Sequence, residues 1–258
     1  MRPERRRNGP SAADDGPSFG PGFLAALPLF AAYELGLGTS TAQGLRSPAE
    51  RVLLAVPDLA FGHDGAPRWI RPALLTVAAA LVVGRLRRSP ARGPGASRAV
   101  IEGLGAGVVL APLLVALLAW TRGLHVDVGA EPSRGLPELL RLLGAAPWEE
   151  LLFRVGIYGL LFVVTARAAA FLGVPSGARG WGAELVGLLG SSTAFALFHL
   201  DAVQSVLGGH GEPFVSGLFA WRLLAGLVLG AWMRLRGFGV VAWAHAIFNL
   251  GIALGIPP

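Results

Sequence analysis

The sequence contains no cysteine and no lysine. Without cysteine, the chain has no disulfide framework, no thiolate zinc site and no cysteine nucleophile. All 22 basic residues are therefore arginine, and the formal net charge is +6. In a nucleic-acid-binding protein this charge would gather on one face, with aromatic residues between the charges. Here it is grouped in short loops between apolar segments, so we expect no nucleic-acid partner. Arginine, alanine, glycine and proline without lysine are typical of a GC-rich bacterial genome.

Charged residues are also scarce. They make up 15% of the chain, whereas an ordinary soluble domain carries about 25%. Hydrophobic residues make up 53% and the mean hydropathy is +0.57. This composition predicts an integral membrane protein with an all-α fold, a polytopic bundle of about seven transmembrane helices. The seven apolar segments are 20–38, 69–83, 99–120, 147–171, 181–200, 214–233 and 238–256.

We expect two parts in the chain. Residues 1–19 are polar, basic and rich in proline and glycine, and are predicted to be a disordered tail. Residues 20–258 are predicted to be one helical domain. Basic residues cluster at 1–7, 85–98 and 234–236. Seven spans would place all three clusters on one side of a bacterial cytoplasmic membrane, with the N-terminus in the cytoplasm.

The fourth apolar segment begins with two adjacent carboxylates, Glu149 and Glu150, and Arg154 follows. A charged side chain near the centre of a bilayer costs about 2.5–3.5 kcal/mol on insertion scales, so these groups need partners or water. At helical spacing Glu150 and Arg154 share one face and can form an ion pair. Glu149 is rotated away from both and has no obvious local partner. A carboxylate in this setting is a candidate general base, or a solvated group at the membrane interface.

Two later segments carry further polar residues. Phe195 is followed four residues later by His199, at the end of the fifth apolar segment. In the last segment, His245 and Asn249 lie four residues apart and share a helical face. A single histidine among apolar residues is more often a hydrogen-bonded core residue than a catalyst. The three patterns together are more specific than each alone, because they occur in order in the fourth, fifth and seventh apolar segments.

The ordered set E-E-x-x-x-R, F-x-x-x-H and H-x-x-x-N resembles the CAAX prenyl protease and bacteriocin-processing (CPBP) family of intramembrane endopeptidases, relatives of the Rce1-type prenyl protease. The resemblance covers about the last 110 residues, and the rest of the chain resembles the family only as generic membrane helices. It implies that Glu149 is the base that activates a water molecule and that His199 helps to hold this water. It also implies that His245 and Asn249 stabilise the oxyanion of the tetrahedral intermediate.

The resemblance implies supporting roles for Glu150 and Arg154, as an ion pair that fixes the helix, and for Phe195 of the second motif. Zinc ligation by the same carboxylates and histidines is the alternative, because three or four oxygen and nitrogen ligands plus water satisfy this metal. We favour catalysis without a metal, because the chain has no H-E-x-x-H motif and asparagine is a poor zinc ligand.

The expected substrate is a peptide or a membrane protein in contact with the lipid bilayer. In a bacterium we do not expect a prenylated CAAX protein as the native substrate. Two other classes of function stay open. One is a non-catalytic membrane scaffold or immunity protein that retains the fold. The other is a small transporter in which Glu34, Glu149 and Arg154 line the pathway, although the sequence shows none of the internal repeats typical of transporters.

Overall fold

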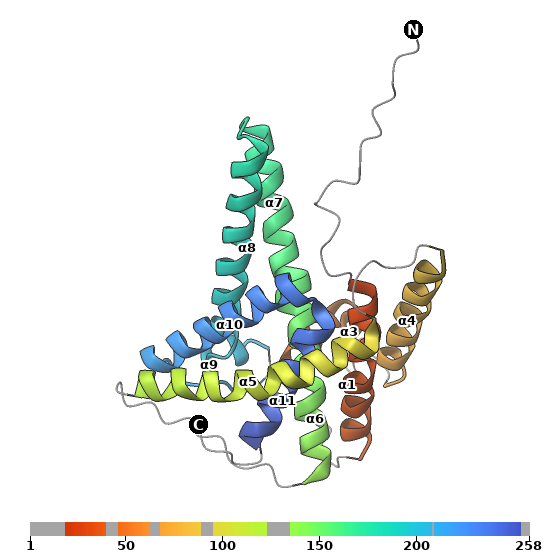
Figure 1. The fold of residues 1–258 in the computed structure, drawn as a ribbon. Helices are drawn as coiled ribbons and strands as arrows, with labels where there is room; N and C mark the ends of the chain where they lie inside the picture. The colour runs from red at the N-terminus through yellow and green to blue at the C-terminus, as the bar shows by residue number, and fades with distance from the viewer. Residues whose placement is uncertain are drawn as a thin grey trace.

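The computed structural model describes residues 19–39, 46–61, 68–88, 95–122, 135–207 and 209–253. Its described part is an all-α bundle, which confirms the predicted fold class (Figure 1). The predicted tail lies outside these residues, except for Phe19, which begins the first helix. The helices are α1 (Phe19–Thr39), α2 (Pro48–Leu53), α3 (Ala55–Phe61), α4 (Ile70–Arg88), α5 (Ala96–Arg122), α6 (Leu136–Glu150), the π-helical segment η3 (Leu151–Ile157), α7 (Tyr158–Phe171), α8 (Ser176–Phe198), α9 (Asp201–Gln204), α10 (Ser216–Arg236) and α11 (Phe238–Ala253).

Within the described residues, five helical segments are long and apolar enough to cross a membrane. They are Phe19–Gly38, Ala96–Leu114, Leu136–Phe171, Ser176–Phe198 and Ser216–Arg236. The two other predicted spans are also helical, as α4 and α11. However, α4 is not among the five, and the apolar part of α11, Phe238–Gly251, is shorter. The chain is therefore an integral membrane protein, and the count of seven spans stays a prediction.

The fourth predicted helix begins earlier than expected. We expected it to start at about Pro147, after a separate amphipathic piece at 136–143. In the structure α6, η3 and α7 form one continuous helical segment from Leu136 to Phe171. Proline removes one backbone hydrogen bond inside a helix, but Pro147 is buried with Gly144, Ala145 and Ala146, and α6 packs closely against α1. This packing offsets the lost bond, so the two carboxylates lie inside a long helix rather than at its start.

Helix α11 lies at the centre of the bundle and contacts α1, α5, α6 and α10 (Figure 1). Small residues allow this close packing, as is common between membrane helices. A Cβ atom added at Gly103 of α5 would lie 2.4 Å from the Cβ of Trp243, and one at Gly107 would lie 2.6 Å from that of Ile247. The position of α11 matters because this helix carries His245 and Asn249.

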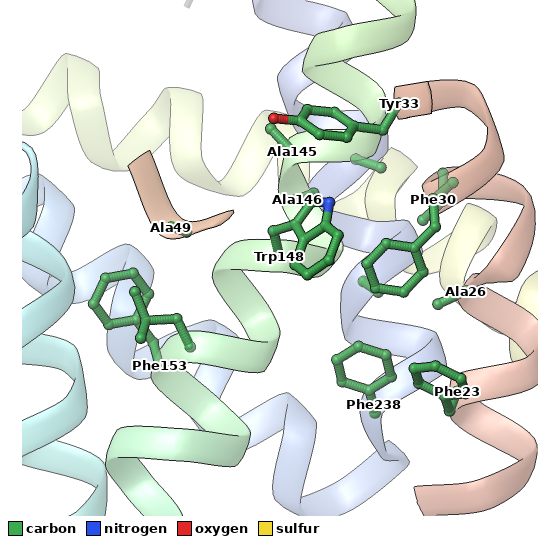
Figure 2. Close-up of a cluster of buried hydrophobic side chains, with 14 of the residues drawn as sticks. Phe23, Ala26, Phe30, Tyr33, Ala49, Ala145, Ala146, Trp148, Phe153 and Phe238 are labelled. Atoms are coloured by element: carbon green, nitrogen blue, oxygen red, sulfur yellow. The ribbon is translucent and has the colours of Figure 1, made fainter. Parts of the chain in front are cut away.

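Aromatic side chains fill the space between α1, the α6–η3 segment and α11 (Figure 2). The rings of Phe30 and Trp148 meet edge to face, with centroids 5.0 Å apart. Phe23 lies against Phe238 of α11, with ring centroids 6.4 Å apart. Trp148 directly precedes the two carboxylates in sequence. Its burial in this cluster therefore fixes the helical turn from which Glu149 and Glu150 project.

Gly144→Ala is expected to destabilise the protein. An added Cβ would lie 2.3 Å from the Cβ of Tyr33 and 2.6 Å from the carbonyl oxygen of Leu29, so α1 and α6 would have to separate. Overpacking of this kind costs about 1–3 kcal/mol. Gly159→Ala on α7 is the matched control, because its Cβ would meet nothing within 4 Å. Thermal unfolding in detergent should show a lower Tm for Gly144→Ala only, and equal Tm values would contradict the α1–α6 packing.

Candidate active site

The four residues predicted to be catalytic line one cavity of about 320 Å³. Glu149 reaches it from α6, His199 from the residue after α8, and His245 and Asn249 from α11. The other lining residues come from the start of α2 and the residue before it, and from α6, α10 and α11: they are Ser47, Pro48, Glu138, Arg141, Leu142, Ala145, Arg222 and Ala253. The three sequence motifs, which span 101 residues from Glu149 to Asn249, therefore converge at one place.

Glu150 lies behind the cavity wall and is fully buried. Its Oε2 atom is 3.3 Å from Nε of Arg154, so the ion pair expected from the spacing is present. Arg154 lies in the π-helical segment η3, and such segments occur frequently at functional sites. The Arg154 guanidinium stacks 4.5 Å from the ring centroid of Phe195, and its Nη2 atom is 3.4 Å from the carbonyl oxygen of Gly226. These contacts join the segment to α8 and α10.

Glu150 has a second partner, which the sequence did not predict. Its Oε1 atom is 2.7 Å from Nδ1 of His245. A carboxylate only accepts hydrogen bonds, so Nδ1 of His245 is the donor. The other ring nitrogen, Nε2, lies 3.8 Å from Oε2 of Glu149. This distance is too long for a hydrogen bond. The imidazole is therefore fixed by one carboxylate and faces the other across a gap.

His199 is oriented by the chain that precedes it. Its Nδ1 atom is 2.8 Å from the carbonyl oxygen of Phe195, and this carbonyl can only accept, so Nδ1 carries the hydrogen. The rings of Phe195 and His199 also meet edge to face at 4.7 Å. In the neutral imidazole, Nε2 is then a hydrogen-bond acceptor. Asn249 is held one turn beyond His245 on α11, with Nδ2 3.5 Å from the carbonyl oxygen of Leu142.

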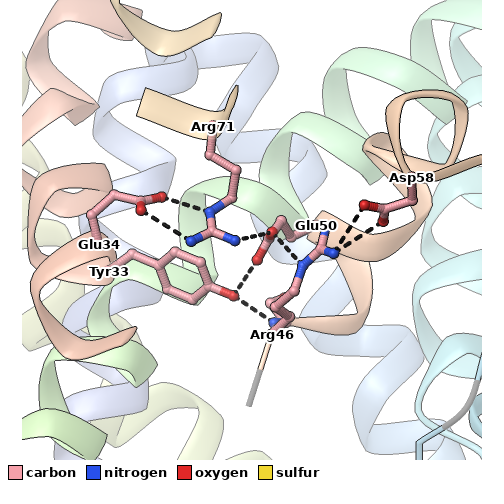
Figure 3. Close-up of polar contacts among 7 residues, drawn as sticks. Tyr33, Glu34, Arg46, Glu50, Asp58 and Arg71 are labelled. Atoms are coloured by element: carbon pink, nitrogen blue, oxygen red, sulfur yellow. Dashed lines mark hydrogen bonds and ion pairs between the residues drawn. The ribbon is translucent and has the colours of Figure 1, made fainter. Parts of the chain in front are cut away.

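A buried ion network supports the α2 side of the cavity (Figure 3). Glu50, fully buried on α2, accepts hydrogen bonds from Tyr33 at 2.6 Å, from Arg46 at 2.7 Å and from Arg71 at 3.2 Å. Tyr33 also accepts a hydrogen bond from the backbone N–H of Ser47, a cavity residue. The network therefore holds the start of α2 against the site.

Glu34 also belongs to this network. Its Oε1 atom is 2.9 Å from Nε of Arg71, and Glu34 is not among the residues that line the cavity. The transporter hypothesis needed Glu34, Glu149 and Arg154 on one pathway. Among the described residues, only Glu149 of these three lines the cavity. Glu34 therefore pairs with Arg71 in the ion network and does not line the cavity with Glu149, so this arrangement does not favour the transporter hypothesis.

Arg222 lines the cavity, but none of the three sequence motifs includes it. It lies in the apolar segment predicted at 214–233 and projects into the cavity from α10. No local spacing connects it to the motifs. One signal could have found it, because an ionisable residue inside an apolar membrane segment is a functional-site hypothesis by default.

Zinc does not fit the arrangement of the described residues. A catalytic zinc site usually has three protein ligands and one open position. Among the described residues, no group of three or more His, Cys, Asp or Glu side chains is placed to hold a metal ion. We therefore derive no step of a reaction from a bound metal.

Comparison with known proteins gives a match, and it covers the part of the chain that contains the candidate site. The family model described as type II CAAX prenyl endopeptidase Rce1-like matches residues 136–251. No curated protein and no solved structure matches the chain. The matched segment runs from α6 into α11 and contains all the residues of the three motifs. Residues 136–251 therefore match the Rce1-like protease family, and this match confirms the predicted resemblance to the CPBP family.

Proposed function

We propose that this protein is an intramembrane endopeptidase that hydrolyses a peptide bond of a membrane-associated or peptide substrate. The observation that carries the proposal is the convergence of Glu149, His199, His245 and Asn249 on one cavity. The cavity also contains the groups that peptide hydrolysis requires: a base for the water nucleophile and hydrogen-bond donors for the oxyanion. The family match supports hydrolase activity, and the mechanism below is our proposal.

In this mechanism Glu149 removes a proton from a water molecule, and the resulting hydroxide attacks the carbonyl carbon of the peptide. His199 supports the step because its Nδ1 atom is bound to the Phe195 carbonyl, which leaves Nε2 free to accept a hydrogen bond from the water. The tetrahedral intermediate then collapses, the C–N bond breaks, and the proton on Glu149 passes to the leaving amine. The products are a carboxylate and an amine.

The oxyanion of the intermediate needs hydrogen-bond donors. Asn249 and His245 are the donors in this proposal, and both lie on α11. The side-chain amide of Asn249 has N–H groups to donate. His245 donates Nδ1–H to Glu150, so donation from its Nε2 atom requires that both ring nitrogens carry hydrogen. Glu150 and Arg154 have a supporting role, because they fix His245 and the helix around it.

We also propose an orientation in the membrane. Arg85, Arg87 and Arg88 end α4, and Arg234 and Arg236 end α10. The positive-inside bias places both ends in the cytoplasm. With the N-terminus also in the cytoplasm of a bacterial cell, the substrate would be a secreted peptide, a bacteriocin leader or a membrane protein.

Purified protein in proteoliposomes is expected to cleave members of an internally quenched peptide library. Glu149→Gln protein, prepared in the same way, should cleave none of them. Mass spectrometry of the products would give the cleavage position, and a comparison of new peptide termini in cells with either protein would give native substrates. Identical peptide termini in both cell lines and no cleavage in vitro would favour the non-catalytic scaffold.

A further inference from the structure

Arg222 lies among the residues proposed to be catalytic, although no motif includes it. It lines the same cavity as Glu149, His199, His245 and Asn249. Its side chain is only 19% exposed. A guanidinium remains charged in proteins, so the cavity that contains the proposed base also has a permanent positive charge.

Two contacts fix the Arg222 side chain. Its Nη2 atom forms an ion pair with Oε1 of Glu212, and its guanidinium carbon lies 5.1 Å from the ring centroid of Trp221. Trp221 is itself buried and donates a hydrogen bond to the carbonyl oxygen of Leu114 at 3.0 Å. The Nε atom of Arg222 has no hydrogen-bond partner among the described residues. The side chain is thus held in place without committing all five of its N–H donors.

Glu212 connects Arg222 to His199. The backbone N–H of Glu212 donates to the carbonyl oxygen of His199 at 2.8 Å, and its carbonyl accepts from the N–H of Asp201 at 2.8 Å. Glu212 therefore holds the chain at His199 with its backbone and Arg222 with its side chain. Preorganised charges of this kind stabilise a transition state without reorganising during the reaction.

His245 and Asn249 alone offer few free hydrogen-bond donors to the oxyanion, and Arg222 can provide more. His245 commits Nδ1–H to Glu150, and a neutral His245 then presents an acceptor at Nε2. Asn249 directs its Nδ2 atom to the carbonyl of Leu142, at 3.5 Å. His245 thus donates to the oxyanion only when both of its ring nitrogens carry hydrogen, and the amide of Asn249 already has a backbone partner. Arg222 adds donors and a full positive charge to the same cavity.

We propose that Arg222 is a further catalytic residue that binds the oxyanion of the tetrahedral intermediate. The inference rests on the proposed hydrolysis. When hydroxide adds to the carbonyl carbon, the C=O π electrons move to the oxygen, and the guanidinium N–H groups donate to that oxygen. When the C–N bond breaks, the electrons return to the carbonyl and the hydrogen bonds weaken. Arg222 gives up no proton, so the step is balanced without another reactant.

Arg222→Gln is expected to lower kcat by about 10²–10³-fold, the effect of losing one oxyanion donor, with little change in KM. Arg222→Lys should restore part of kcat, because the charge remains but the planar fork is lost. Arg234→Gln is the matched control. Arg234 is also on α10 and also pairs with a glutamate, Glu184, but it does not line this cavity. It should keep the wild-type kcat, measured on the library peptide that the wild type cleaves fastest.

A phosphinic analogue of that peptide separates an oxyanion contact from a structural role. The phosphinate imitates the charged tetrahedral intermediate, and such analogues report binding in the transition state. Its affinity for Arg222→Gln should fall by the same factor as kcat/KM. A higher KM with unchanged kcat would assign Arg222 to substrate binding and overturn the proposal, as would unchanged kinetics. Failure of hydrolysis itself would be recognised separately, because the wild-type protein would then show no more cleavage than Glu149→Gln.

Discussion

Glu149→Gln is expected to lower turnover by at least about 10²-fold, the lower end of what general-base catalysis contributes. Glutamine has nearly the same shape as glutamate, but its amide does not take a proton from water. The loss should not come from misfolding. Among the described residues, Glu149 has an ionic contact only with Nε2 of His245, at 3.8 Å, so its side chain contributes little to packing. The variant should therefore accumulate and unfold like the wild type.

Two further variants sharpen this test. Glu149→Asp keeps the carboxylate but moves it back by one methylene, so we expect turnover between those of the wild type and Glu149→Gln. Glu102→Gln makes the same carboxylate-to-amide change on α5, where the side chain pairs with Arg98 and Arg236 outside the cavity. It should keep full turnover. Wild-type turnover in Glu149→Gln would show that another group activates the water.

Local patterns were enough to predict the parts of the site that depend on a single helix. Glu150 and Arg154 are four residues apart, so their ion pair follows from helix geometry alone. The all-α membrane fold follows from the scarcity of charge and the long apolar segments. The meeting of three motifs at one cavity was implied by the family resemblance, because their spacing in sequence does not fix how the helices pack.

Contacts between distant segments could not be predicted. The hydrogen bond between Glu150 and His245 joins residues 95 positions apart. Arg222 reaches the cavity because α10 packs against α8, α5 and α11, and no residue spacing records this packing. The predicted start of the fourth helix, at about Pro147, was wrong for a related reason. Proline at position 147 favours a helix start by local rules, and contacts between α6 and α1 override them.

Glu150 and Arg154 are neighbours on one helical turn, and both side chains are buried. The exposed fraction of the side chain is 0% for Glu150 and 2% for Arg154. Burying such a pair costs solvation energy that the mutual attraction only partly recovers, so its presence is weak evidence for stability. Here the pair has another role, because Glu150 also orients His245. The two contributions, to stability and to chemistry, can be separated by mutation.

Arg154→Ala is expected to destabilise the protein by about 3–5 kcal/mol, the usual cost of removing one partner of a buried pair. Glu150 would retain only His245 as a partner in the described structure, and the contact with the Phe195 ring would be lost. Arg154→Lys should restore only part of the stability, because lysine lacks the planar guanidinium that stacks on an aromatic ring. Thermal unfolding in detergent and the folded yield measure both effects.

The double variant Glu150→Leu/Arg154→Met should recover stability but not activity. Replacing a buried ion pair by apolar side chains of similar volume is often neutral or stabilising. The same change removes the carboxylate that accepts Nδ1–H of His245, so the imidazole loses its orientation and turnover should stay low. A double variant with wild-type turnover would show that Glu150 does not position His245. Wild-type unfolding of Arg154→Ala would instead show that the pair is solvated and that η3 does not pack against α8 as described.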